Sequence, residues 1–418
     1  MRFLTQDDPE IAALVRQEAS RIEDTLDLIA AENHSPPSVM EAQGSIFNTK
    51  TIEGYPGKRF HAGCIYADAV ENLAVSRAKT LFGADHANVQ PHSGTSANLG
   101  VYFSVLEVGD RILSMSLPHG GHLSHGHRAS ITSKCFHFDH YSVDPQTERI
   151  DYDAVRARAE KFQPKMIVAG ASAYPRRIDY AEMARIAEDV SAYLFVDMAH
   201  IAGLVAANVI PSPVPVCDFV SFTCYKTLMG GRGGVILCKQ TYARQLDRTV
   251  FPGCQGTTAV NLMAAKAVTF RLAMTPAFKK IQEKTVENAV QLAAVLVQKG
   301  YRIVTGGTDN HQVIVDVSTQ GIDGQTAERC LEEAGLVINR NMIPRDTAKP
   351  GAVSGIRLGT AAVSTRGMGS AEIASIAGWI DQVLSAPQDR DLGRRIRKAV
   401  GELCRRFPVY PEGGGAAN

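Results

Sequence analysis

Short apolar runs alternate with helical patterns between residues 89 and 240 of this chain. Each apolar run has the length of a buried strand, and each helical pattern repeats its apolar positions every three or four residues. The predicted strands are 112–115, 166–169 and 194–196, with Val89 in an earlier run, and the predicted helices are 95–106, 152–162 and 181–190. Strands that alternate with helices predict an α/β fold with a mainly parallel sheet covered by helices on both faces.

The pattern changes on both sides of this region. Asp8 and Pro9 are suited to a helix start, and helical spacing continues from there to Leu26. Residues 48–63 are polar and irregular and predict a loop. After Pro252, helices are predicted at 261–272 and 277–299, then a smaller α+β region with strands at 313–317 and 356–358. We therefore expect an N-terminal helical arm (1–50), a large domain (51–280) and a small C-terminal domain (281–418).

Composition describes an ordinary globular chain. Its 418 residues exceed what one hydrophobic core usually serves, which supports more than one domain. A net charge of +1 gives no reason to expect nucleic acid or a membrane surface as a partner. Neither a signal peptide nor an apolar run long enough to span a membrane stands out. Eight cysteines without C-x-x-C pairs suit reduced thiols, so a cytoplasmic location is predicted.

A lysine and an aspartate each follow an apolar strand pattern. Lys226 lies between the run 221–223 and a glycine-dense turn, and Asp197 ends the run 194–196. A lysine amine in an apolar setting has a lowered pKa and is nucleophilic toward carbonyls. Pyridoxal phosphate (PLP) chemistry needs a lysine for its Schiff base and an acid for the pyridinium nitrogen. A lone lysine after a strand is more often a solvated end residue, but the pair favours a PLP enzyme.

A phosphate-binding turn is predicted upstream, where Ser93, Gly94 and Thr95 lie between a strand and a helix. Backbone N–H groups and the positive end of the helix dipole attract an anion at such a helix start. Any strand-to-helix turn can use these residues as a cap, so the motif gains weight from the aspartate and lysine downstream.

The histidine-rich stretch 119–127 raises the question of a metal site. Histidine is a common ligand, but no carboxylate or cysteine completes a close set in the sequence. Glycines between the histidines would let the backbone approach a flat ligand. We predict no metal here, and an imidazole stacked on a cofactor ring.

Long motifs spread over nearly the whole chain resemble the serine hydroxymethyltransferase family. They are Leu28-Ile29-Ala30-Ala31-Glu32-Asn33, Glu53-Gly54-Tyr55-Pro56-Gly57-Lys58-Arg59, Asn88-Val89-Gln90-Pro91-His92-Ser93-Gly94, Val196-Asp197-Met198-Ala199-His200-Ile201-Ala202-Gly203-Leu204 and Ser354-Gly355-Ile356-Arg357. The resemblance implies a fold-type I PLP-dependent transferase, active as a homodimer with shared sites. It also implies tetrahydrofolate as the acceptor of the hydroxymethyl group.

The resemblance implies roles for individual residues. Lys226 would form the Schiff base, Asp197 would hold the pyridinium nitrogen, and His122 would stack on the ring. Other cofactor contacts would come from Ser93, Gly94, Thr95, Ser172, His200, Tyr225 and, from the partner subunit, Gly256. Arg357 would bind the substrate carboxylate with its bidentate fork, and Glu53 would handle protons. Thr51, His61 and Ala31 match further substrate positions, and Leu117, Gly121, Leu123 and Asn341 match folate positions.

The chain departs from the family pattern around the substrate. The departures are Ala31 for serine, Thr51 for tyrosine, Phe60-His61 for a tyrosine pair, Tyr225 for histidine, Gly256-Thr257 for paired glycines, and Lys349-Pro350-Gly351 in a folate-contacting stretch. Replacing tyrosine by Thr51 removes an aromatic ring and would make room for a substituent on the substrate Cα. The predicted reaction is therefore transfer of a hydroxymethyl group from 2-methylserine to tetrahydrofolate, which gives D-alanine.

Two alternatives remain open. One is serine hydroxymethyltransferase acting on L-serine, or a folate-independent aldolase acting on β-hydroxy amino acids. The other is a non-catalytic PLP-binding or regulatory protein, against which the joint presence of Lys226, Asp197, Arg357 and Glu53 argues.

Overall fold

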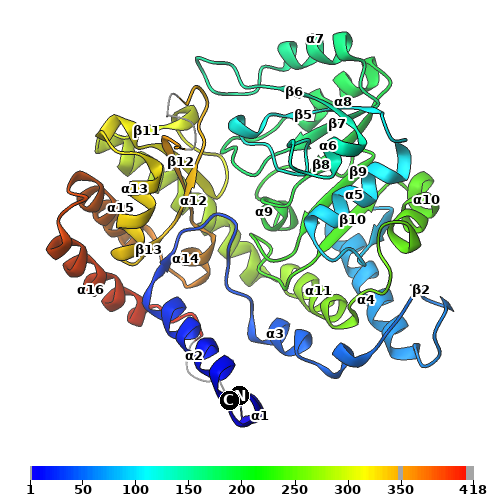
Figure 1. Ribbon diagram of the computed structural model, residues 1–418, viewed down its shortest axis with the longest axis horizontal. Coiled ribbons are helices and arrows are strands. Elements are labelled where there is room, and N and C mark those ends of the chain that lie inside the picture. The colour runs from blue at the N-terminus through cyan, green and yellow to red at the C-terminus, as the bar shows by residue number, and fades with distance from the viewer. Residues whose placement is uncertain (1, 347–351, 411–418) are drawn as a thin grey trace. The chain divides into compact units, whose positions relative to one another are not determined.

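The structure is a computed structural model that describes residues 2–346 and 352–410. The departure at 349–351 lies outside these residues. Contacts within the chain divide it into two units, shown in Figure 1. The central unit comprises residues 38–283, and the terminal unit comprises residues up to 37 and from 284 onward. The division into arm, large domain and small domain stays a prediction.

The central unit is built on a seven-stranded sheet, as the alternating pattern predicts. Four neighbouring pairs, β5–β6, β5–β7, β7–β8 and β8–β9, are parallel, and β10 runs antiparallel to both β9 and β4. In spatial order the strands are β4 (His86–Asn88), β10 (Gly234–Cys238), β9 (Phe219–Thr223), β8 (Tyr193–Asp197), β7 (Met166–Gly170), β5 (Arg111–Met115) and β6 (His137–Tyr141).

Helices cover this sheet. Its helices are α3 (Pro37–Gln43), α4 (Ile65–Phe82), α5 (Gly94–Val105), α6 (Thr132–Cys135), α7 (Tyr152–Phe162), α8 (Tyr180–Asp189), α9 (Ala202–Ala206), α10 (Ala243–Arg248) and α11 (Val260–Ala273). Helix α7 contacts β5 and β6, α8 contacts β7 and β8, and α5 contacts β9 and β10 (Figure 1). Every residue of β7 and β9 is buried, as expected for strands covered on both faces.

Local sequence explains where the helices begin. Asp151 and Asp179 cap α7 and α8 by accepting hydrogen bonds from backbone N–H groups of the first turn. Ser93 and Ser96 form a reciprocal capping box at the start of α5. The predicted loop 48–63 also contains a short hairpin of β2 (Gly54–Tyr55) and β3 (Lys58–Arg59).

Both ends of the chain build the terminal unit. The predicted N-terminal helix is present as α2, capped by Asp8. An antiparallel sheet has the order β11-β12-β15-β14, and β1 pairs in parallel with β13. The elements are α1 (Arg2–Asp7), α2 (Pro9–Asp24), β1 (Leu26–Asp27), α12 (Pro276–Gln298, which begins in the central unit), β11 (Arg302–Ile303), β12 (Gln312–Asp316), α13 (Gly324–Glu333), β13 (Leu336–Val337), β14 (Asn339–Asn341), β15 (Gly355–Gly359), α14 (Ala361–Thr365), α15 (Ser370–Ser385) and α16 (Arg390–Arg406).

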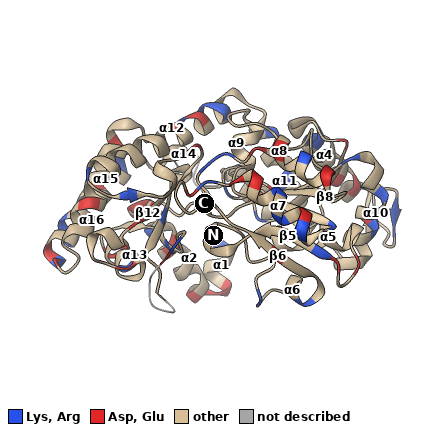
Figure 2. Ribbon diagram, turned by 90° about the horizontal axis from the view of Figure 1, so that it is seen from above, with Lys and Arg blue, Asp and Glu red and all other residues tan. Residues whose placement is uncertain are grey.

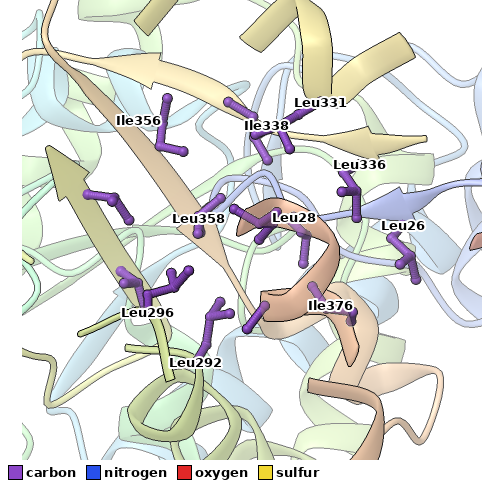
Figure 3. Close-up of a cluster of buried hydrophobic side chains, with 14 of the residues drawn as sticks. Leu26, Leu28, Leu292, Leu296, Leu331, Leu336, Ile338, Ile356, Leu358 and Ile376 are labelled. Atoms are coloured by element: carbon purple, nitrogen blue, oxygen red, sulfur yellow. The ribbon is translucent and has the colours of Figure 1, made fainter. Parts of the chain in front are cut away.

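The core of the terminal unit joins residues from distant parts of the sequence. Leu26 and Leu28, from the N-terminal segment, are fully buried with Leu336, Ile356 and Leu358 (Figure 3). Burying a leucine side chain contributes roughly 1.5–3 kcal/mol. The N-terminal segment therefore helps to close this core.

Charged residues of both signs are interspersed along the helices of both units (Figure 2). This arrangement agrees with the near-neutral net charge of the chain. Among the described residues, no helix is both long enough and apolar enough to cross a membrane.

Candidate active site

A cavity in the central unit brings together most of the predicted cofactor residues. It lies at the carboxyl ends of β8 and β9, where ligands of open α/β sheets usually bind. The residues that line it are Ser93, Gly94, Thr95, His122, Ala171, Ser172, Asp197, Ala199, His200, Thr223, Tyr225 and Lys226. The cavity is therefore lined by segments that lie more than a hundred residues apart in the sequence.

Lys226 lies three residues beyond the end of β9, and only 7% of it is exposed. The next residue fixes the turn, because the Thr227 hydroxyl donates to the His200 carbonyl (2.8 Å) and accepts from the Gly203 N–H (3.0 Å). The side-chain amide of Gln282 donates to the Thr227 carbonyl (2.8 Å). The lysine therefore extends from a rigid turn into the cavity.

Asp197, the last residue of β8, is held as a carboxylate. Its Oδ2 accepts hydrogen bonds from His125 Nε2 (3.0 Å) and Asn98 Nδ2 (2.8 Å), and its Oδ1 accepts one from the Ala199 N–H (3.0 Å). Burial alone would raise the pKa of Asp197, but the hydrogen bonds from His125 and Asn98 and the electrostatic attraction of the neighbouring histidines outweigh it and hold this pKa well below the usual range. The carboxylate is therefore negatively charged at neutral pH.

His122 is neutral at the same pH. Burial lowers the pKa of this imidazole to about 4. Its Nδ1 lies 2.7 Å from the Ser124 hydroxyl, which also accepts from Asn98 Nδ2 (2.9 Å). An uncharged ring fixed in this way can stack on a flat cofactor.

Ligand atoms of His122, His125 and Asp197 lie within 4.8 Å of one another. Such a group could hold a metal ion, and the carboxylate that completes it, Asp197, lies far from the histidine-rich stretch in the sequence. However, Oδ2 of Asp197 already accepts from both His125 and Asn98, so we interpret the group as a hydrogen-bond network. The prediction of no metal stays a prediction.

The predicted phosphate turn lies at the start of α5. The backbone N–H groups of Gly94 and Thr95 belong to the first helical turn, where N–H groups have no partner within the helix. A Cβ added to Gly94 would lie 2.8 Å from Thr223 Cγ2, so glycine keeps this part of the cavity open. An anion bound here would meet N–H groups and the positive end of the helix dipole.

These residues fit PLP. A buried amine, an ionised carboxylate, a neutral imidazole and a helix start surround one cavity, and they match the aldehyde, ring nitrogen, ring face and phosphate of the cofactor. Tyr225 also lines the cavity, and the Arg232 guanidinium lies 4.2 Å from the centre of its ring.

The predicted folate residues of the central unit lie on either side of His122 in the sequence. Gly121 is required here, because an added Cβ would lie 2.2 Å from the Met115 carbonyl oxygen. Leu117 begins a 3₁₀ turn, and Leu123 is 53% exposed. Exposed apolar surface at Leu123 is compatible with a contact to the flat ring of folate.

The predicted proton-handling segment does not line this cavity. The backbone of Ile52, between Thr51 and Glu53, is clasped by Thr257, whose hydroxyl accepts from the Ile52 N–H (3.0 Å) and donates to its carbonyl (2.5 Å). Glu53 Oε1 lies 4.0 Å from where a Cβ on Gly256 would be. Glu53 and Gly256 thus lie close to each other, beside the contact between Ile52 and Thr257.

His61 lies on the exposed end of the same loop. Its carbonyl oxygen accepts a hydrogen bond from the Cys64 thiol (3.1 Å), and the neighbouring Phe60 is 76% exposed. His61 does not line the cavity of its own chain.

The remaining predicted residues belong to the terminal unit. Arg357, in the middle of β15, is 9% exposed and donates from Nε to Asn339 Oδ1 (3.1 Å). Burial lowers its pKa to about 10, so it stays positively charged at neutral pH. Asn341 lies on the adjacent strand β14. Ala31 follows a segment packed on β15, since the Gly359 N–H donates to the Leu28 carbonyl (2.7 Å).

Sequence reasoning missed Asn98, Ser124 and His125. Asn98 is a buried polar residue between Ala97 and Leu99 in α5, and its amide among apolar neighbours is a signal that the sequence contains. The other two stand within the histidine-rich stretch, which gives no sign of which histidine faces Asp197.

Comparison with known proteins agrees with this site. Residues 4–380 match the model of the family described as "Serine hydroxymethyltransferase". Two curated relatives named serine hydroxymethyltransferase, from Dehalococcoides mccartyi strain CBDB1 and strain ATCC BAA-2100 / JCM 16839 / KCTC 5957 / BAV1, are each 50% identical over 410 residues. These alignments cover 98% of this chain and 99% of each relative. The chain therefore belongs to the serine hydroxymethyltransferase family, whose members use PLP with tetrahydrofolate as co-substrate.

Proposed function

We propose that the protein transfers a hydroxymethyl group from L-serine to tetrahydrofolate, with PLP held on Lys226. The observation that carries this proposal is the single cavity in which Lys226, Asp197 and the start of α5 meet. The curated relatives, which are named for serine, support L-serine over 2-methylserine as the first choice of substrate.

When bound, PLP supplies the electron sink that allows the bond between the substrate Cα and its hydroxymethyl carbon to break. Asp197, as a carboxylate, would accept a hydrogen bond from the ring nitrogen and keep its proton in place. His122 would cover the ring without adding a charge. The N–H groups of Gly94 and Thr95 would hold the phosphate and so orient the cofactor.

Arg357 binds the substrate carboxylate through its planar fork. Its contact with Asn339 orients the guanidinium before substrate arrives. Replacing Arg357 with alanine should raise the KM for the amino acid roughly a hundredfold and leave PLP bound. An unchanged KM in steady-state assays would exclude this role.

Glu53 handles protons near the hydroxymethyl group, and Gly256 serves the phosphate of a partner subunit. Because these residues pack together away from the cavity of their own chain, we infer that both act in the partner's site of a homodimer. Leu117, Gly121, Leu123 and Asn341 contact the folate.

A second candidate substrate is 2-methylserine, with D-alanine as the product. The observation in its favour is Thr51, a short side chain on the segment clasped by Thr257 beside Glu53. If Thr51 replaces a ring next to the substrate, a methyl group fits where L-serine carries its α-hydrogen. A tyrosine there would overpack the site and cost roughly 1–3 kcal/mol, which is about a ten- to hundredfold loss in rate.

Purified protein supplied separately with L-serine, 2-methylserine and D-alanine, with and without tetrahydrofolate, distinguishes the candidates. Folate-dependent cleavage of L-serine at least as fast as that of 2-methylserine excludes the second candidate. Preference for 2-methylserine that is lost in Thr51→Tyr, with serine turnover kept, would establish it.

The anchoring lysine is tested separately. Borohydride should trap PLP on Lys226, as located by peptide mass spectrometry, and Lys226→Ala should carry no such link. PLP trapped on a different lysine contradicts the assignment.

A further inference from the structure

A second lysine of the central unit is fully buried. Lys266, in α11, is 1% exposed, and its ammonium donates to three backbone carbonyls: those of Val89 (2.7 Å), Pro91 (3.0 Å) and Gly234 (2.9 Å). These three bonds use all three of its protons. The side chain therefore has one fixed position.

This lysine makes no ion pair among the residues that the structure describes. A buried charge is costly unless it is paired, and burial accordingly lowers the pKa of Lys266 to about 8. The ammonium is still largely protonated at neutral pH. Lys266 is thus a buried positive charge that no carboxylate of the described residues contacts, although Glu71 attracts it from farther away.

Two of the three carbonyls belong to the segment that leads into the phosphate turn, and the third belongs to β10. Val89 and Pro91 lie between β4 and Ser93, and the Gly234 N–H donates to the Pro91 carbonyl (3.0 Å). A Cβ added to Gly234 would lie 2.2 Å from the Ser93 carbonyl oxygen. Lys266, β10 and the segment 89–93 are therefore packed as one piece.

A glycine at position 233 leaves room for the side chain of Lys266. Gly233 has a φ of +136°, and a Cβ at this position would lie 2.3 Å from Lys266 Cε. Any other residue at 233 would be strained and would displace the lysine stem. The backbone is thus arranged around this side chain.

We propose that Lys266 is a positioning residue for the cofactor phosphate. Two of its hydrogen bonds hold the segment 89–93 and the third ties that segment to β10, so the N–H groups at the start of α5 face the phosphate. Its positive charge is buried and only partly offset by attraction to Glu71, so it favours the phosphate dianion over the monoanion. The proposal rests on the proposed function, because it requires PLP at this turn.

Binding of PLP and of pyridoxal, which keeps the aldehyde and ring but lacks the phosphate, separates this role from general support of the fold. In Lys266→Met we expect the dissociation constant for PLP to rise about tenfold or more, while that for pyridoxal changes less than about twofold. Equal weakening of both ligands would overturn the proposal, as would no weakening of either.

Arg77→Met is the matched control. Arg77 is also a cation that donates to a backbone carbonyl of α11, that of Ala267 (2.7 Å), but it does not contact the segment 89–93. Its loss should leave the ratio of PLP to pyridoxal affinity unchanged. A changed ratio in this control would contradict a specific role for Lys266.

Two further measurements keep the test decisive if Lys266→Met fails to fold. Lys266→Gln donates hydrogen bonds without a charge and should show the same selective loss of PLP affinity. In the wild-type holoenzyme, the ³¹P signal of PLP should remain that of the dianion at pH values where free PLP gains a proton; titration as in free PLP would refute the charge role. Wild-type protein that binds no PLP at all would instead contradict the proposed function.

Discussion

Two neighbouring groups in the cavity have opposite charge states, although both are buried. Asp197 stays ionised because His125 and Asn98 donate to it, whereas the hydrogen bond between His122 and Ser124 does not compensate the imidazole for the loss of water. The cavity therefore offers one fixed negative charge beside a neutral ring. That combination suits a cationic ring nitrogen with an uncharged stacking partner.

The neutral histidine should make stability depend on pH. Folding lowers the pKa of His122 to about 4, so the unfolded chain takes up the proton first and stability falls as the pH drops from about 6.5 toward 4. Replacing His122 with phenylalanine should reduce the loss between pH 7 and pH 5 by about 2 kcal/mol. Chemical unfolding at both pH values checks this.

His34 provides the comparison within the terminal unit, because burial lowers its pKa to about 4 as well. The loss of stability at low pH that is due to His34 should persist in the variant His122→Phe. If the free energy of unfolding depended equally on pH in wild type and variant, His122 would not be neutral in the folded protein.

The sequence was informative about site residues that end strands or start helices. Asp197, Lys226 and the turn 93–95 were predicted because each interrupts an apolar pattern with a chemical group, and all of them line the cavity. Asn98 could not be paired with Asp197 in advance, since their contact joins residues 99 positions apart. Position in the fold, not residue type, decides such contacts.

At the scale of elements, one threonine links two loops. The Thr257 hydroxyl satisfies both backbone groups of Ile52, so Thr257→Val would leave a donor and an acceptor without partners. An unsatisfied buried group costs about 1–3 kcal/mol, and a displaced Glu53 should lower kcat about tenfold. Thr257→Ser keeps the hydroxyl and should restore the rate. A valine variant with wild-type kcat would show that the hydrogen bonds between Thr257 and Ile52 do not position Glu53.

Arg366 joins the ends of two helices in the terminal unit. Its guanidinium donates to the carbonyls of Thr25, after α2, and of Cys404 and Phe407, at the end of α16. These bonds place a positive charge where the helix dipoles are negative. Arg366→Met should lower the free energy of unfolding by roughly 3 kcal/mol or more, because it leaves buried carbonyls unpaired.

Urea unfolding measures this effect against Arg21→Met, which removes a cation from an exposed ion pair. The control should change stability by less than about 1 kcal/mol. Similar losses in both variants would mean that the carbonyl contacts of Arg366 contribute little.

The predicted bounds of helices and strands agree with the structure where the hydrophobic pattern was regular. Helix α7 begins and ends at the predicted residues, β7 is one residue longer than predicted at its carboxyl end, and α5 begins and ends one residue earlier than predicted. Strand β6, His-Phe-Asp-His-Tyr, was missed, because a strand at the edge of a sheet need not be apolar. Val89 lies just after β4 rather than within it.

At the scale of the whole molecule, exposed apolar side chains gather between residues 46 and 66. Ile46, Phe60, Ile65 and Tyr66 are each 74–80% exposed. Several exposed apolar side chains within one short stretch of sequence are typical of an interaction surface, and we expect this stretch to be buried in the proposed homodimer. Ile65→Glu should yield monomers in sedimentation velocity and abolish hydroxymethyl transfer. Val108→Glu, at a position 72% exposed elsewhere in the central unit, should remain dimeric.

The pairing of β1 with β13 has a consequence for synthesis on the ribosome. Leu26 emerges early, but its partner Leu336 follows only after roughly 300 more residues, or about 15–60 s at typical elongation rates. The central unit lies entirely between them, so its sheet can form while the N-terminal segment still waits. A charged replacement at Leu26 or Leu28 should therefore let the nascent central unit become protease-resistant on schedule and block only the later closure of the terminal unit.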